Sequence, residues 1–169
     1  MMEICNEISN LLGIMRKRKQ DRQRYMQYPA TREETDELCR TTKKRYDMEL
    51  SSVYRSILLT TNGFRENGVV LYGTETRLLE GYKEDMYVEG FLEANEEWKH
   101  NIDLANHIVY AESDTYLFAQ SSRTGLFSCH TRGDFEESLL WETPNDTFFF
   151  ETILKLSVDD DFYIQDVLK

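Results

Sequence analysis

The chain has 169 residues, of which 40% are hydrophobic and 12% aromatic; this suits one domain with a single core and excludes a disordered tail. The sequence has no run of about 18 apolar residues that could cross a membrane, and its three cysteines are far apart, so we expect a cytoplasmic protein without a disulfide framework. The net charge of −11 disfavours a nucleic-acid partner.

The first predicted element is a helix over residues 3–27, which Pro29 ends. Its second half contains the basic run of residues 16–24, with six positive side chains and one negative. Because the apolar residues precede this run, their order is not that of a secretory signal. The run is poor in aromatic residues, which favours a solvated helix face, able to dock on the acidic half of a neighbouring molecule, over a nucleic-acid contact. The apolar stripe of the helix consists of Ile4, Ile8, Leu11, Leu12 and Met15.

Thr31 and Glu34 have the spacing of a capping box, which predicts a second helix that runs to about Tyr46. The side chains expected to face inward from it are Leu38, Cys39 and Thr42.

Residues 50–73 are the most informative stretch of the chain. A short helix is predicted to begin at Ser51 or Ser52, whose hydroxyl can accept a backbone N–H. The Asn-Gly pair at 62–63 is expected to end it, because glycine adopts the left-handed conformation without a steric penalty. A second Asn-Gly pair at 67–68 predicts a turn, and residues 69–72 predict a buried strand. The apolar face of the short helix consists of Val53, Tyr54, Ile57 and Leu58.

A fourth helix is predicted over residues 85–99, although Gly90 is unfavourable in its middle. Its apolar residues at helical spacing are Tyr87, Phe91, Ala94 and Trp98.

From His107 onward the hydrophobic period changes from 3.6 to 2. Short apolar runs alternate with polar turns, which predicts a β-meander and therefore an antiparallel sheet. The runs are residues 108–111, 116–119 and 126–129, followed by a turn over 131–134 and a candidate strand over 136–141.

The next predicted element is a helix that starts at Thr143 and Pro144, with the proline at its first helical position. Three adjacent phenylalanines at 148–150 exceed one helical stripe, so a strand is the alternative. The aspartates at 159–161 are expected to end this element as a solvated turn, which leaves 162–168 as a short terminal element.

No pattern in the sequence predicts catalysis. A nucleophile elbow, a phosphate-binding loop and a dinucleotide fingerprint are all missing, and nothing singles out a catalytic pair among the 31 acidic residues. Cys129 and His130 are adjacent in a predicted strand and would point to opposite faces, so they do not predict a metal site. We therefore expect neither an enzyme nor a bound cofactor or metal.

The order of these elements resembles the SUKH superfamily over residues 29–156. The resemblance rests on the short helix with Asn-Gly at 62–63, the glycine-bounded strand that ends at Gly73, and Glu-Ser-Asp at 112–114 between two strands. Two positions depart from the family pattern: Leu50-Ser51 replaces leucine-proline, and Ala111 replaces a glycine. The resemblance implies a SUKH-like α+β domain over residues 29–169, an antiparallel sheet with helices packed on one face, preceded by an N-terminal helical extension over residues 1–28.

Bacterial members of this superfamily typically act as immunity proteins that neutralise a toxin domain, whereas others are regulatory binding modules. The resemblance thus implies a non-enzymatic immunity protein with a basic toxin domain as partner; a regulatory or scaffold protein of the same fold is the alternative, and a nucleic-acid-associated factor is a more distant one. Charge agrees with a basic partner, because residues 1–74 carry 13 basic and 10 acidic side chains whereas residues 75–169 carry 7 basic and 21 acidic ones. Ordinary solubility would also explain this acidic half.

Carrying family positions onto this chain gives Glu112 and Asp114 as a candidate binding edge, with Trp98, Tyr110 and Tyr116 nearby in sequence. The alternative is that Asp114 only caps a turn and that Trp98 belongs to the core.

Overall fold

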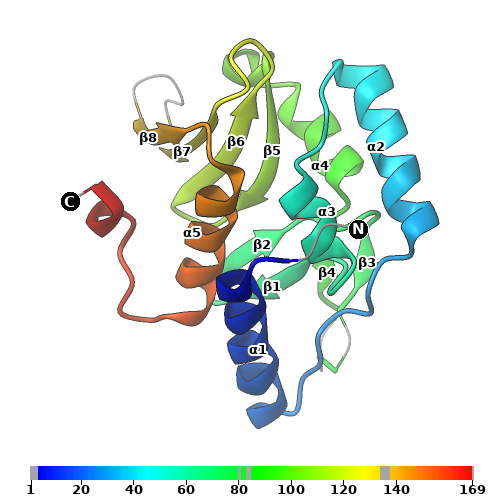
Figure 1. Cartoon of the computed structure of the whole chain (residues 1–169), viewed down its shortest axis with the longest axis vertical. Helices are drawn as coiled ribbons and strands as arrows, with labels where there is room; N and C mark the ends of the chain where they lie inside the picture. The colour runs from blue at the N-terminus through cyan, green and yellow to red at the C-terminus, as the bar shows by residue number, and fades with distance from the viewer. Residues whose placement is uncertain (1–3, 80, 83–84, 134–137, 169) are drawn as a thin grey trace.

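Six strands form an antiparallel sheet in the order β1-β2-β5-β6-β7-β8, and helices α1 and α5 pack against it (Figure 1). The computed structural model describes residues 4–79, 81–82, 85–133 and 138–168. This architecture confirms the predicted α+β class. The strands of the sheet are β1 (Phe64–Glu66), β2 (Val69–Leu71), β5 (His107–Glu112), β6 (Tyr116–Ser121), β7 (Phe127–Thr131) and β8 (Leu139–Thr143), and β3 (Arg77–Leu78) pairs with β4 (Tyr87–Val88) in a smaller sheet. The helices are α1 (Asn6–Asp21), α2 (Arg32–Tyr46), α3 (Ser52–Leu58), α4 (Phe91–Trp98) and α5 (Asp146–Val158), with two 3-10 turns, η1 (Ile102–Leu104) and η2 (Ile164–Leu168).

Helix α1 packs against α5 through its predicted apolar stripe, but it ends at Asp21 and not near residue 27. The chain turns away because Gln23 adopts a left-handed conformation with φ of 57°. The prediction that the basic run is a solvated face is wrong for Lys19, whose side chain is buried and lies 3.3 Å from the carboxylate of Glu66. Through Lys19, the basic run therefore also forms an ion pair between α1 and strand β1.

Helix α2 begins with the predicted capping box, in which Thr31 and Glu34 exchange side-chain and backbone hydrogen bonds. Helix α3 is likewise capped by Ser51 as expected, but it ends at Leu58, before the Asn-Gly pair that was predicted to stop it. Gly63 does adopt a left-handed φ of 77°; it leads into strand β1, which the sequence did not predict.

The turn at 67–68 joins β1 to β2, with φ of 50° at Asn67 and 75° at Gly68. Positive φ at both central residues is the geometry that favours Asn-Gly in two-residue hairpins. The predicted turn and the predicted buried strand after it are therefore confirmed.

The predicted helix over 85–99 is half correct, because strand β4 occupies its first residues and α4 begins only at Phe91. Gly90 is the residue before the helix, and a Cβ there would lie 2.7 Å from the Cα of Glu75. Close approach of two backbone segments, and not a helix interior, is what requires glycine at this position.

The three predicted strands of the meander are confirmed as β5, β6 and β7. Helix α5 is confirmed over its strand alternative, but Asn145 is its capping residue, so Pro144 precedes the cap and is not the first helical residue. The predicted turn over 131–134 and strand over 136–141 fall partly outside the described residues, and β8 begins at Leu139.

Adjacent phenylalanines of α5 fill the core because they contact different neighbours. The ring of Phe150 stacks 5.8 Å from that of Tyr54 on α3, whereas Phe149 lies 4.9 Å from Phe127 on β7. Phe148 packs at the rim, 5.4 Å from the indole of Trp141. Within the described parts of the chain, no helix is both long and apolar enough to span a membrane.

Candidate functional site

The Glu-Ser-Asp turn joins β5 to β6, and its serine closes it. The hydroxyl of Ser113 accepts the backbone N–H groups of Thr115 at 3.2 Å and of Tyr116 at 2.9 Å. Asp114 does not cap the turn; its side chain is exposed and has no hydrogen-bond or ion-pair partner among the described residues. The turn is thus rigid while its aspartate is available to a partner.

Glu112 faces the protein and not the solvent. The hydroxyl of Tyr72 donates to its Oε2 at 2.5 Å, and Nε1 of Trp98 donates to the same hydroxyl at 2.9 Å. Burial, with the Glu112 carboxylate beside it, raises the pKa of Tyr72 well above its ordinary value. The phenol therefore stays protonated and remains a donor to Glu112.

Arg132, which directly follows strand β7, packs beside the hydrogen-bonded side chains of Trp98, Tyr72 and Glu112. Its guanidinium lies 5.4 Å from the ring centroid of Trp98, and its Nη1 donates to the carbonyl of Ser113 at 2.9 Å. Sequence reasoning did not include Arg132, because only the fold brings residue 132 next to residues 98 and 113.

The structure does not bring Tyr110 and Tyr116 to this edge. Tyr110 is fully buried, and its hydroxyl donates to Oε1 of the half-buried Gln120 at 2.9 Å. Tyr116 lies 6.4 Å from Phe118, whose ring packs against α5, so it faces the opposite side of the sheet from Glu112. Of the five candidate residues, Glu112 and Trp98 are joined through Tyr72, and Asp114 lies beside them.

A groove between α2 and α4 is a second candidate site, which the sequence did not single out. It encloses about 430 Å³. Its polar lining is dominated by glutamates of the first turns of α2 and by Glu75, over an apolar floor. The lining residues are Glu33, Glu34, Glu37, Leu38, Arg40, Thr74, Glu75 and Leu92.

Hydrogen bonds favour the charged form of two carboxylates of this acidic groove. The backbone N–H of Thr31, with the guanidinium of Arg77, lowers the pKa of Glu34, and a hydrogen bond from Arg40 lowers the pKa of Glu37. Arg40 in the lining pairs with Glu37, and Arg77 beside it pairs with Glu34 and Glu75, so four carboxylates against two guanidinium groups leave the groove with a net negative charge. The sequence signal was present in the dense acidic start of α2, but it was explained there by helix capping alone.

Within the described ranges, no group of three or more His, Cys, Asp or Glu side chains could hold a metal ion. Cys129 is buried, and burial raises the pKa of its thiol. A thiol of this kind is a poor nucleophile.

No family model matches the chain, and no curated protein matches it in sequence.

Proposed function

We propose that the protein is a non-enzymatic binding module for a basic protein, and that it acts as an immunity protein which neutralises a toxin domain. The acidic groove between α2 and α4 carries this proposal, because it combines ionised carboxylates with an apolar floor. A lysine or arginine side chain entering the groove could place its stem on Leu38 and Leu92 and its charge on the glutamates.

The adjacent surface of α4 also carries negatively charged side chains. On α4, Glu93, Glu96 and Glu97 are exposed, and among them Glu96 is paired with Arg45 at 3.2 Å. An extended acidic surface accelerates the encounter with a basic partner, and toxins that act on nucleic acid carry basic surfaces. The resemblance of residues 29–156 to the SUKH superfamily supports the more specific role of toxin neutralisation.

The test is to capture the partner from the native host, with the protein as bait, and to measure association kinetics at low and high salt. The variant Glu33→Gln, Glu37→Gln, Glu75→Gln removes three charges from the groove and retains hydrogen-bonding side chains. We expect its association rate to fall by about tenfold at low salt, and the difference to shrink at high salt.

A matched control removes three exposed charges elsewhere, through Glu7→Gln, Glu142→Gln and Asp161→Asn. Its association rate should stay within about twofold of the wild-type rate, because it leaves the local field of the groove unchanged. Equal losses in both variants, or a partner that binds independently of salt, would contradict the proposal.

Toxin neutralisation has its own readout. Expression of the captured partner should arrest bacterial growth, and co-expression of this protein should restore it. A partner without toxicity would favour the regulatory or scaffold role instead.

The β5–β6 turn is tested in the same kinetic assay with the variant Asp114→Asn. The variant Glu112→Gln is less suitable, because it would also disturb the hydrogen bond that Glu112 accepts from Tyr72.

A further inference from the structure

The fold uses only part of the basic run at residues 16–24. Arg16 and Lys17 are exposed on α1 and have no ion-pair partner among the residues that the structure describes. The other four cations are engaged: Arg18 with Asp160 at 3.2 Å, Lys19 and Arg22 with Glu66 at 3.3 and 2.9 Å, and Arg24 with the Tyr82 ring at 4.3 Å from its centroid. Two charges of the run therefore remain available to another molecule.

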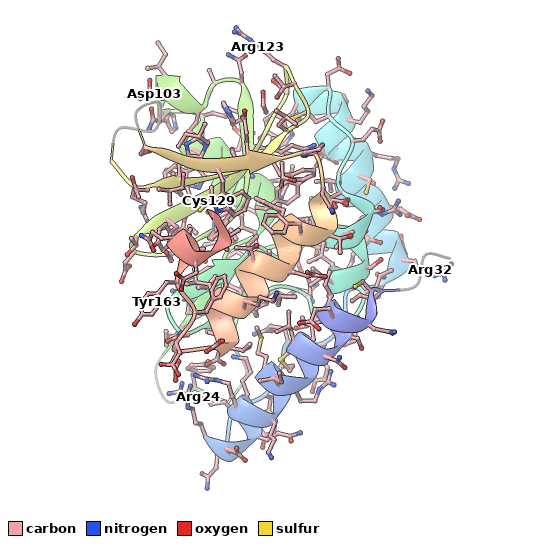
Figure 2. The ribbon with its side chains drawn as sticks, turned by 60° about the vertical axis from the view of Figure 1, so that its left-hand side comes forward. Arg24, Arg32, Asp103, Arg123, Cys129 and Tyr163 are labelled. Atoms are coloured by element: carbon pink, nitrogen blue, oxygen red, sulfur yellow. The ribbon has the colours of Figure 1, made fainter. Side chains whose placement is uncertain are left out.

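A groove lies beside Arg16, between α1 and the loop that follows it. Figure 2 shows this loop near the labelled Arg24, at the end of the molecule where α1 finishes. The groove encloses about 380 Å³, and most of its lining surface is apolar. The lining residues are Arg16, Gln20, Tyr25, Met26 and Tyr28.

The two tyrosines of this groove are unusually exposed for their size. Tyr25 is 62% exposed and Tyr28 is 74% exposed. Scattered exposed side chains are normal on a protein surface, but here two aromatic rings share one groove with a guanidinium that has no ion-pair partner among the described residues. Tyrosine and arginine are the residue types that most often dominate protein-binding surfaces.

The backbone under these rings is fixed. The carbonyl of Tyr28 accepts the N–H of Asn62 at 3.1 Å, and that of Gln27 accepts the Thr61 hydroxyl at 3.3 Å. A Cβ added to Gly81 would lie 2.9 Å from the ring of Tyr25, so this ring lies close against the backbone of Gly81. A surface held in place before binding loses little conformational entropy when a partner docks.

We propose that this groove, the tyrosine groove, binds an acidic segment of a partner protein. A carboxylate of the segment pairs with the guanidinium of Arg16, and a neighbouring apolar or proline side chain packs between the rings of Tyr25 and Tyr28. The positive charge of Lys17 also attracts the acidic segment at long range.

An acidic peptide fits these observations better than nucleic acid does. Single-stranded nucleic acid also uses aromatic rings and cations, but it needs a continuous basic path for several phosphates. This surface offers two cations, Arg16 and Lys17, that the described part of the chain leaves unpaired, and the net charge of the chain is −11, which suits one or two carboxylates.

The tyrosine groove shares no lining residue with the acidic groove between α2 and α4, and it selects the opposite charge. The inference therefore goes beyond the proposed function and does not depend on it. If both hold, the protein joins a basic partner to an acidic one.

The test uses a phage-displayed library of random 12-residue peptides as the probe, selected on the full chain after counter-selection on the Tyr28→Ala variant. We expect the enriched peptides to combine Asp or Glu with proline or an aromatic residue. Synthetic copies should lose at least tenfold in affinity for Tyr25→Ala, Tyr28→Ala and Arg16→Glu. All of these residues are exposed or lie at the surface, so the variants should keep the wild-type melting temperature.

The matched control is Ile102→Ala, which removes a side chain that is 86% exposed and lies outside the groove. It should leave peptide affinity unchanged. The proposal is overturned if no peptide discriminates between the wild-type protein and Tyr28→Ala, or if the enriched peptides are basic. It is also overturned if a dT12 oligonucleotide binds in a Tyr28-dependent manner and the peptides do not. A loss of the acidic-groove charges should not affect peptide binding, which separates this test from that of the proposed function.

Discussion

Gly63 and Gly68 have nearly the same backbone conformation, with φ of 77° and 75°, but different surroundings. A Cβ at Gly63 would lie 2.7 Å from the carbonyl oxygen of Leu71 and 2.8 Å from a methyl of Val88. A Cβ at Gly68 would meet no atom within 4 Å. The two positions therefore separate backbone strain from steric overlap.

We predict that Gly68→Ala costs about 1 kcal/mol of unfolding free energy, which is the strain of a left-handed alanine. Gly63→Ala should cost about 2–4 kcal/mol, because overlap with the neighbouring backbone adds about 1–3 kcal/mol to the same strain. Urea unfolding of both variants measures the difference. Equal losses would mean that the region around Gly63 relaxes and that its close packing has no energetic role.

At the β5–β6 turn, the sequence predicted the candidate residues but not the side chains that contact them. Glu112 and Asp114 were expected to act together, yet the carboxylate of Glu112 is bound by Tyr72 while that of Asp114 is free of partners among the described residues. Glu112 is the last residue of β5 whereas Asp114 lies in the turn, and the role of each carboxylate depends on which distant side chains reach it. Nothing local in the sequence identifies Tyr72 or Arg132 as these partners.

At the scale of elements, short sequence motifs predicted those helix starts and turns whose hydrogen bonds form between residues close in the sequence. The capping box of Thr31 and the hairpin at 67–68 are satisfied within a few residues, and both were predicted correctly. The end of α1 and the start of α4 were not predicted. Helix α1 ends in a local turn, in which Gln23 has a φ of 57° and the N–H of Arg24 donates to the carbonyl of Lys19 at 2.8 Å, but no glycine or asparagine marks this turn in the sequence. The start of α4 depends on contacts far along the chain. Gly90, for example, is required by the approach of Glu75 and not by its own helix.

A side chain of α4 that the sequence did not single out, Asn95, hydrogen-bonds directly to the backbone of the sheet. The amide of Asn95 accepts the N–H of Val109 at 2.8 Å and donates to the carbonyl of the same residue at 2.9 Å. Asn95 is fully buried, so it satisfies two backbone groups of β5 that water cannot reach.

We predict that Asn95→Ala lowers the unfolding free energy by about 2–6 kcal/mol, because it leaves two buried backbone groups unpaired at about 1–3 kcal/mol each. Hydrogen exchange at the Val109 amide should accelerate more than exchange elsewhere in β5. Glu97→Ala, an exposed change on the same helix, is the control and should cost less than about 0.5 kcal/mol. A loss for Asn95→Ala as small as that of the control would show that α4 is held by other contacts.

For the whole molecule, the sequence predicted the α+β class and the meander, because periodicity is repeated over many residues and tolerates local errors. It did not predict how α1 relates to the rest. The resemblance implied an extension over residues 1–28, whereas the apolar stripe of α1 packs into the same core cluster as α3 and α5. Buried charge strengthens this attachment, since Lys19 donates to the carbonyl of Arg65 at 3.0 Å in addition to its pairing with Glu66.

We predict that residues 29–169 alone do not fold cooperatively. Four apolar side chains of α1 are at most 6% exposed, namely Ile8, Leu11, Leu12 and Met15. Burial of each stabilises the fold by about 1.5–3 kcal/mol, so their loss removes about 6–12 kcal/mol. This equals most of the roughly 5–15 kcal/mol that usually stabilises a domain. Thermal unfolding followed by circular dichroism should show no sigmoidal transition for residues 29–169, and addition of a peptide of residues 1–28 should restore one. A cooperative transition without the peptide, near that of the full chain, would instead establish residues 1–28 as a separate extension, and the basic run would then be available as a whole.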